Sequence, residues 1–159
     1  MTWKVYLSGE IHSNWRQQII DGASANSLPI AFTSAVTNHE ASDAAGDLLG
    51  AEQDAFWRDH KSSKVNAIRT KTHLQDCDIA IIRFGEKFKQ WNAAFDAGYA
   101  AALGKPLIIL HQPEHNHALK EVDAAAKVVA QTPQQVVDVL SYAIKGSMPL
   151  HKYVKDAAE

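Results

Sequence analysis

Short apolar runs alternate along the chain with longer segments in which apolar residues recur at helical spacing. The apolar runs predict five β-strands, at residues 3–8, 28–34, 78–84, 106–111 and 126–131. The runs DIAIIRF (78–84) and PLIILH (106–111) are apolar at nearly every position, which is typical of strands buried on both faces of a parallel sheet. We therefore expect these two strands in the interior of the sheet.

The intervening segments supply the helices. Helices are predicted at residues 13–23, 55–77, 91–103 and 132–144, and a loop with a short helix at residues 113–123. Thr132 as N-cap followed by Pro133 is a typical helix start. Gly104, with Pro106 just beyond it, ends the helix that precedes them.

Two polar stretches in the first half of the chain interrupt this pattern. The segment HEASDAAGDLLGAEQ (39–53) is polar and rich in Ala and Gly, and we expect a loop that leads into a helix. The segment 55–77 is mostly helical, and its two consecutive serines, Ser62 and Ser63, mark the place where one break is possible.

Strands that alternate with helices imply a parallel sheet with right-handed crossovers and helices on both faces. The sequence predicts a three-layer α/β sandwich, flavodoxin- or Rossmann-like, with five parallel strands in the order 2-1-3-4-5. No repeat or linker divides the chain, so we expect a single domain over residues 1–159. In such sheets ligands bind beyond the carboxyl ends of the strands, where the strand order reverses.

Composition excludes several classes of partner. The 159 residues are 46% hydrophobic and 21% charged, with a net charge of −2, which gives no electrostatic reason to expect nucleic acid or an anionic membrane. No apolar run approaches the roughly 18 residues of a membrane span, and the N-terminus does not read as a signal peptide. The single cysteine, Cys77, fits a reducing compartment. We expect a cytoplasmic protein whose partner is a small molecule.

The candidate chemistry lies at the predicted strand ends. Asp96 stands in the stretch FDAGYAAALGKP, among small and apolar residues, and is either a solvated helical carboxylate or an acid that points into a pocket. Ser8, Gly9 and Glu10 follow the first strand, where a glycine lets the backbone approach a ligand. Glu10 is a candidate proton donor or sugar-binding acid. We expect Tyr6, at the end of the same strand, to line one cleft with these four residues.

Further candidates follow the second and third strands. Gln90, Trp91 and Asn92 offer an aromatic face for a base and amides for hydroxyls, although Trp91 also suits helix packing. His39 and Glu40 form either a pocket edge or a surface loop. Arg83, Lys87 and Lys89 form either a solvated face or a phosphate-binding group.

The sequence contains no motif for a metal or a common cofactor. None of the eight histidines stands in an H-E-x-x-H or Cys/His pattern, and neither G-x-G-x-x-G nor G-x-x-x-x-G-K-[ST] occurs. We therefore expect no metal and no cofactor.

Several strings resemble the nucleoside 2-deoxyribosyltransferase superfamily. They are VYLSG after the first strand, CDIAIIRFG, and FDAGYAAALGKPLIIL. The longer strings HEASDAAGD, FWRDHKSSKVNAIRT and KQWNAAFDAGYAAALGKP are similar to one branch, the YtoQ-type proteins. This resemblance runs over nearly the whole chain.

The resemblance implies a reaction and roles for particular residues. In the superfamily a carboxylate attacks the anomeric carbon of a 2′-deoxyribonucleoside, and a second base or water resolves the glycosyl-enzyme ester. Asp96 matches the nucleophilic Glu and Tyr6 the tyrosine that orients it, whereas Gln90 and Thr70 replace acids that contact the sugar and the base. Asp is shorter than Glu by one methylene, about 1.5 Å of reach.

Two functions follow from the resemblance and its departures. The first is an enzyme of N-glycosidic bonds, transferase or hydrolase, that uses Asp96. The second is a non-catalytic nucleoside or nucleotide sensor that keeps the pocket. The resemblance also implies a homo-oligomer.

Overall fold

A five-stranded parallel sheet forms the centre of the computed structural model, which describes residues 1–87 and 90–147. The strands are β1 (Trp3–Gly9), β2 (Ile30–Ser34), β3 (Ile79–Arg83), β4 (Leu107–Leu110) and β5 (Val128–Ala130). They pair in the order β2-β1-β3-β4-β5, each neighbour parallel. The predicted fold class and strand order are confirmed, with the two most apolar strands, β3 and β4, inside the sheet.

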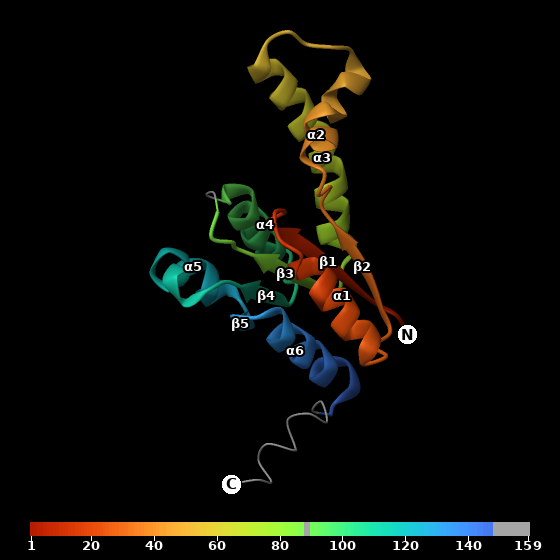
Figure 1. Cartoon of the computed structure of the whole chain (residues 1–159), viewed down its shortest axis with the longest axis vertical. Helices are drawn as coiled ribbons and strands as arrows, with labels where there is room; N and C mark the ends of the chain where they lie inside the picture. Colours follow the sequence, from red (N-terminus) through yellow and green to blue (C-terminus); the bar gives the residue numbers. More distant parts are fainter. Residues whose placement is uncertain (88–89, 148–159) are drawn as a thin grey trace.

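Helices cover both faces of this sheet (Figure 1). The α-helices are α1 (Trp15–Ala25), α2 (His39–Asp43), α3 (Ala55–Asp76), α4 (Trp91–Ala102), α5 (Asn116–Ala125) and α6 (Pro133–Lys145), and the 3-10 helices are η1 (Ala44–Leu49) and η2 (Pro113–His115). Helix α6 begins with the predicted Thr132 cap, which forms a capping box with Gln135. Beyond α4, Gly104 has the positive φ expected of a glycine that ends a helix.

Alternation along β1 sends its side chains to two separate cores. Val5 and Leu7 belong to the core under α1 and α6, whereas Tyr6 belongs to the core under α3 and α4. Ser8, two residues beyond Tyr6, therefore faces the α4 side of the sheet. The alternation along β1 therefore decides which side chains at the end of the strand can contact α4.

The structure corrects two expectations about residues 39–77. The segment predicted to be a loop forms α2 and η1, and α3 runs without a break through Ser62. The hydroxyl of Ser62 donates to the carbonyl of Asp43 and accepts from the amide of Gly46, so this serine joins two helices instead of interrupting one. A Cβ at Gly46 would lie only 2.7 Å from Cβ of Lys61, which explains the glycine at this close approach.

Helix α2 and the first half of α3 extend away from the sheet as an arm (Figure 1). We define the arm as residues 39–66. None of the helices in the described ranges, 1–87 and 90–147, is long and apolar enough to cross a membrane.

Candidate active site

A cleft of about 830 Å³ opens at the carboxyl ends of β1 and β2. Its floor is the segment after β1, one wall is the inner face of the arm and of α3, and the opposite wall is the start of α4. Ser8, Gly9, Glu10 and Asp96 all line it, so the structure brings these four candidates together. The cleft lies where the order of strands reverses between β1 and β3, as the general rule for such sheets requires.

Asp96 sits on the buried face of α4, with only 8% of its surface exposed. The hydroxyl of Ser8, at the end of β1, donates a 2.5 Å hydrogen bond to Oδ2 of Asp96. Burial raises the pKa of the Asp96 carboxyl, and the bond from Ser8 partly offsets that rise. The acid is therefore an oriented, poorly solvated carboxylate and not a solvated helical one.

Tyr6 lies beneath the cleft and does not line it. Its side chain is fully buried, its ring stacks on that of His73 at 5.7 Å, and its hydroxyl has no hydrogen-bond partner within residues 1–87 and 90–147. Burial and then the charge of Asp96 raise the pKa of the Tyr6 hydroxyl. In this structure Ser8, not Tyr6, hydrogen-bonds to the carboxylate of Asp96.

Glu10 reaches the cleft wall, but its carboxylate is bound to its own loop. It accepts hydrogen bonds from the backbone amide of His12 and, at 2.6 Å, from the hydroxyl of Ser13, and it pairs with Nε of Arg83 at 3.5 Å. Burial alone would raise the pKa of Glu10, but these hydrogen bonds and the charge of Arg83 outweigh it and lower the pKa. An acid with a lowered pKa is ionised near neutrality, which does not suit the proton-donor role considered for Glu10.

The remaining candidates divide between the cleft and its surroundings. His39, Gln90, Trp91 and Asn92 line the cleft. The oxygen of the Gln90 side-chain amide accepts from the amide of Gly85, and its nitrogen donates to the carbonyl of Lys87, so Gln90 shapes the loop between β3 and α4.

Besides Tyr6, the candidates Glu40, Arg83 and Lys87 do not line the cleft. Glu40 is exposed on the first turn of α2, next to His39 but outside the lining. Arg83 is not part of the lining, and its Nε lies 3.5 Å from the carboxylate of Glu10. Lys87 is exposed and Lys89 lies outside the described residues.

Helix α3 contributes a row of polar residues that was not among the candidates apart from Thr70. Asp59, Ser63, Asn66 and Thr70 line the cleft and recur every three or four residues, so they share one face of the helix. This spacing is visible in the sequence. We did not recognise this row in the sequence, because a break near Ser62 would place the residues before and after it on different faces of the helix.

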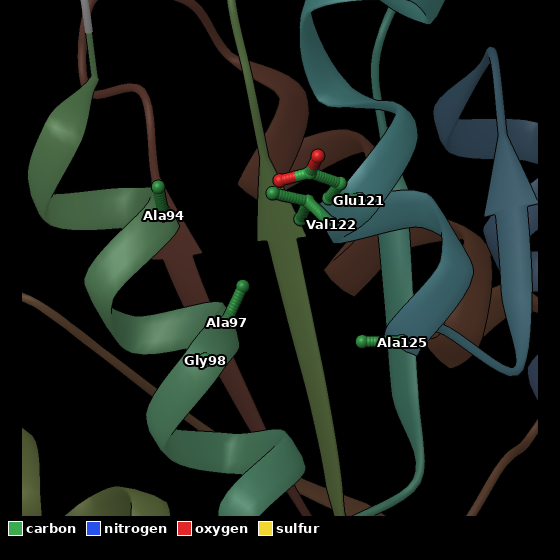
Figure 2. Close-up of a pocket in the computed structure, with 6 residues that line it drawn as sticks. All are labelled: Ala94, Ala97, Gly98, Glu121, Val122 and Ala125. Carbon is green, nitrogen blue, oxygen red and sulfur yellow. The ribbon is translucent and has the colours of Figure 1, made fainter.

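A second, smaller groove lies between α4 and α5 (Figure 2). It measures about 180 Å³ and is lined by Ala94, Ala97, Gly98, Glu121, Val122 and Ala125. Among the described residues that line it, Glu121 alone is ionisable. The groove has few polar groups with which to orient a sugar and a base, so the larger cleft is the candidate active site. Among the described residues no cluster of three or more His, Cys, Asp or Glu side chains could hold a metal ion.

Comparison with known proteins places the chain in a family. Residues 6–144 match the model of the family described as nucleoside 2-deoxyribosyltransferase YtoQ. The chain is 43% identical over 143 residues to the uncharacterized protein YtoQ of Bacillus subtilis (strain 168), covering 89% of this chain and 97% of that protein. The chain belongs to the nucleoside 2-deoxyribosyltransferase YtoQ family, as its sequence motifs indicated.

Solved structures support the fold. A conserved protein from Enterococcus faecalis V583 superposes with a TM-score of 0.63 at 15% identity, covering 90% of this chain and 99% of that one. A 2-deoxyribosyltransferase from Bacillus psychrosaccharolyticus superposes with a TM-score of 0.51, also at 15% identity, covering 85% and 90%. At these identities the likeness concerns the fold alone.

Proposed function

We propose that this protein is an enzyme of N-glycosidic bonds that acts on a nucleoside, with Asp96 as its nucleophile. The observation that carries this proposal is the buried carboxylate of Asp96, which borders the cleft and is held there by Ser8. Membership of the family adds the substrate class, a 2′-deoxyribonucleoside, and the reaction type.

The chemistry follows from the state of this acid. The Asp96 carboxylate oxygen that is not bonded to Ser8 attacks the anomeric carbon, the bond between that carbon and the base nitrogen breaks, and the base leaves with the bonding electrons. A neutral ester links Asp96 to the sugar until a second base or water displaces it. Since burial disfavours the charged acid, forming a neutral ester relieves a cost that the free protein carries.

The two walls of the cleft suit the two halves of a nucleoside. Ser63, Asn66 and Thr70 on α3 present hydroxyl and amide groups for a sugar. Trp91 and Phe95 on α4, 75% and 65% exposed, offer aromatic surface for a base. We infer a substrate that spans the cleft with its anomeric carbon above Asp96.

A non-catalytic sensor is the second candidate. It is favoured by the acid itself, since Asp96 is shorter than the superfamily's glutamate and already accepts a hydrogen bond from Ser8 in the free protein. Such a protein would bind the nucleoside in the same cleft without forming the ester.

A panel of deoxynucleosides, ribonucleosides and their 5′-monophosphates, with and without an added base, separates the two. We expect release or exchange of free base with at least one deoxynucleoside, and loss of several orders of magnitude in turnover for Asp96→Asn with little change in affinity. Ligand-induced thermal stabilisation without turnover would favour the sensor. If no member of the panel is turned over and none stabilises the protein, both candidate functions are refuted.

We also propose that the protein self-associates and that it is cytoplasmic. Four large apolar side chains on the arm, Leu48, Leu49, Phe56 and Trp57, are each more than half exposed, which is costly for a free surface. Cys77 is free and buried, consistent with a reducing compartment.

A further inference from the structure

Arg16 is a buried arginine that holds the backbone next to the candidate nucleophile. It lies on the first turns of α1 and has only 8% of its surface exposed. Its guanidinium donates to three carbonyls at the end of β1: Leu7 at 3.4 Å, Gly9 at 3.0 Å and Glu10 at 2.5 Å. These carbonyls bracket Ser8 on both sides.

Arg16 is in no ion pair among the described residues, although the nearby charge of Glu10 favours its charged form. Within residues 1–87 and 90–147, no carboxylate lies at ion-pair distance from this guanidinium, which packs instead over the ring of Trp15 at 4.5 Å. Burial lowers the pKa of Arg16 to about 10, which still leaves it charged near neutrality. A buried charge is costly, and here the three carbonyls at the end of β1 offset that cost by accepting hydrogen bonds from the guanidinium.

Arg16 and Asp96 lie on opposite faces of the sheet, and β1 runs between them. Leu7 points to the α1 face and Ser8 to the α4 face, where its hydroxyl meets Asp96. Gly9 lies so close to the backbone of Arg83 that an added Cβ would be 2.0 Å from its carbonyl oxygen, and the amide of Glu10 donates to that same oxygen at 3.1 Å. The backbone on either side of Ser8 is therefore hydrogen-bonded both to Arg16 and to the end of β3.

We propose that Arg16 is a positioning residue, which fixes the carboxyl end of β1 so that Ser8 holds the carboxylate of Asp96 in place for attack. This role rests on the proposed function for its catalytic consequence, but not for its structural one. The planar fork of the guanidinium is required, since it spans the carbonyls of Gly9 and Glu10 at once, which a lysine ammonium cannot do with the same geometry.

The test compares Arg16→Lys with Arg58→Lys, a matched change at an exposed arginine of the arm that pairs with Asp47 and does not line the cleft. For Arg16→Lys we expect kcat to fall by about 10- to 100-fold with KM nearly unchanged, since a misplacement of about 1 Å costs that order of rate. The acidic limb of the pH profile of kcat/KM should move to higher pH, because the Ser8 bond that lowers the pKa of Asp96 is weakened. Arg58→Lys should change neither.

Ser8→Ala completes a double-mutant cycle. If Arg16 acts through Ser8, Ser8→Ala shifts the acidic limb in the same direction, and adding Arg16→Lys to it causes little further shift. The proposal would be refuted if the shifts of the acidic limb caused by the two single changes added up in the double variant. It would also be refuted if Arg16→Lys left the acidic limb where it is in the wild type. If Arg16→Lys fails to fold, Trp15→Phe replaces it, since the indole nitrogen donates to the same Glu10 carbonyl at 2.8 Å and its loss should cause a smaller shift of the same sign.

A readout without turnover separates this inference from the proposed function. The pKa of Asp96 is followed in the ligand-free protein by carbon-13 NMR of the carboxyl groups, in the wild type and the same variants. Suppose that the wild type shows no turnover, but that Arg16→Lys raises the pKa of Asp96 and that Arg16→Lys causes no further rise in the presence of Ser8→Ala. This result would refute the enzyme and support the positioning role. If the wild type is active but the pKa of Asp96 is the same in Arg16→Lys as in the wild type, only the positioning role is refuted.

Discussion

The hydroxyl of Ser8 and the carboxylate of Asp96 meet at 2.5 Å across the gap between β1 and α4, although 88 residues separate them in the sequence. Ser8 is two positions beyond Tyr6 on the same face of the strand, and Tyr6 is left without a hydrogen-bond partner in the part of the chain that the structure describes. The contact to Asp96 that the resemblance led us to expect from the tyrosine is made, in this structure, by Ser8. The change goes together with the shorter acid, because an aspartate on α4 meets the serine directly.

Asp96→Asn should stabilise the protein at neutral pH. Burial places the pKa of Asp96 above its ordinary value of 3.8, so the folded chain binds more protons than the unfolded chain between the two pKa values. The free energy of unfolding therefore falls as pH rises through that window. Above the window, the full cost of burying the charged Asp96 destabilises the fold. Each 1 kcal/mol of relief should raise Tm by about 2–4 °C for a chain of this size.

Calorimetry at pH 7.5 and pH 4.5 measures this effect. The gain in Tm from Asp96→Asn should be larger at the higher pH, and Asp59→Asn, an exposed acid in the same cleft, should give no gain. A loss of stability at pH 7.5 would show that the charged form of Asp96 is favourable in the fold.

Glu10→Gln should have the opposite effect on stability. The pKa of Glu10 is lowered from 4.5, so its stabilising contribution is present above that value and is lost as pH falls through the lower, folded-state pKa. The amide group would turn one donor toward the donors of His12, Ser13 or Arg83, which should reduce the free energy of unfolding at pH 7 by about 1–3 kcal/mol.

Urea unfolding at pH 7 and near pH 3.5 tests this. The difference between wild type and Glu10→Gln should shrink at the lower pH, and Glu114→Gln, an exposed acid on η2, serves as the control. An equal difference at both pH values would mean that the charge of Glu10 is not what stabilises the loop.

The sheet was predictable because each strand carries its own local signal. The runs at 78–84 and 106–111 are too continuously apolar to face water, so their place in the interior follows from the residues alone. The capped start of α6 at Thr132 follows in the same way from local rules. Helix α2 starts at a capping residue, Asn38, but its five residues do not establish a period, and it is also held by the hydrogen bond from Asn66 of α3 to Ser42.

The site was predictable only as a neighbourhood. Strand-end positions bring Ser8 and Asp96 to one edge of the sheet, which topology alone requires. Which hydroxyl reaches the acid depends on side-chain directions and on fractions of an ångström, and neither is encoded in spacing. The burial of Arg16 was hidden for a similar reason, because its partners are backbone carbonyls and these carry no sequence signature.

Removing the aromatic side chains at the tip of the arm should weaken self-association. Phe56 and Trp57 are 66% and 53% exposed, with their rings 5.1 Å apart, so Phe56→Ser with Trp57→Ser removes most of the aromatic surface there. We expect the sedimentation coefficient to fall to that of a monomer while circular dichroism stays unchanged. Tyr142→Ser, which removes a similarly exposed ring from α6, should leave association intact. A monomeric wild type, or an assembly that persists in the double variant, would contradict this.

Asp96→Glu tests how the site is built around the shorter acid. Oδ2 of Asp96 already lies 2.5 Å from the Ser8 hydroxyl, so an added methylene of about 1.5 Å has no room in that direction. The longer carboxylate must rotate away, and we expect turnover to fall on the order of 10²-fold, as misplacement of about 1 Å does elsewhere.

Removing the serine hydroxyl should then restore part of the loss. In Ser8→Ala with Asp96→Glu, the space vacated by Oγ admits the longer acid, so the double variant should turn over faster than Asp96→Glu alone, although Ser8→Ala by itself is slower than wild type. Steady-state kinetics on the best deoxynucleoside of the panel measures all four proteins. If Asp96→Glu alone exceeds the wild type, the reach of the aspartate is what limits the rate, and the close contact with Ser8 is a constraint that the longer acid escapes.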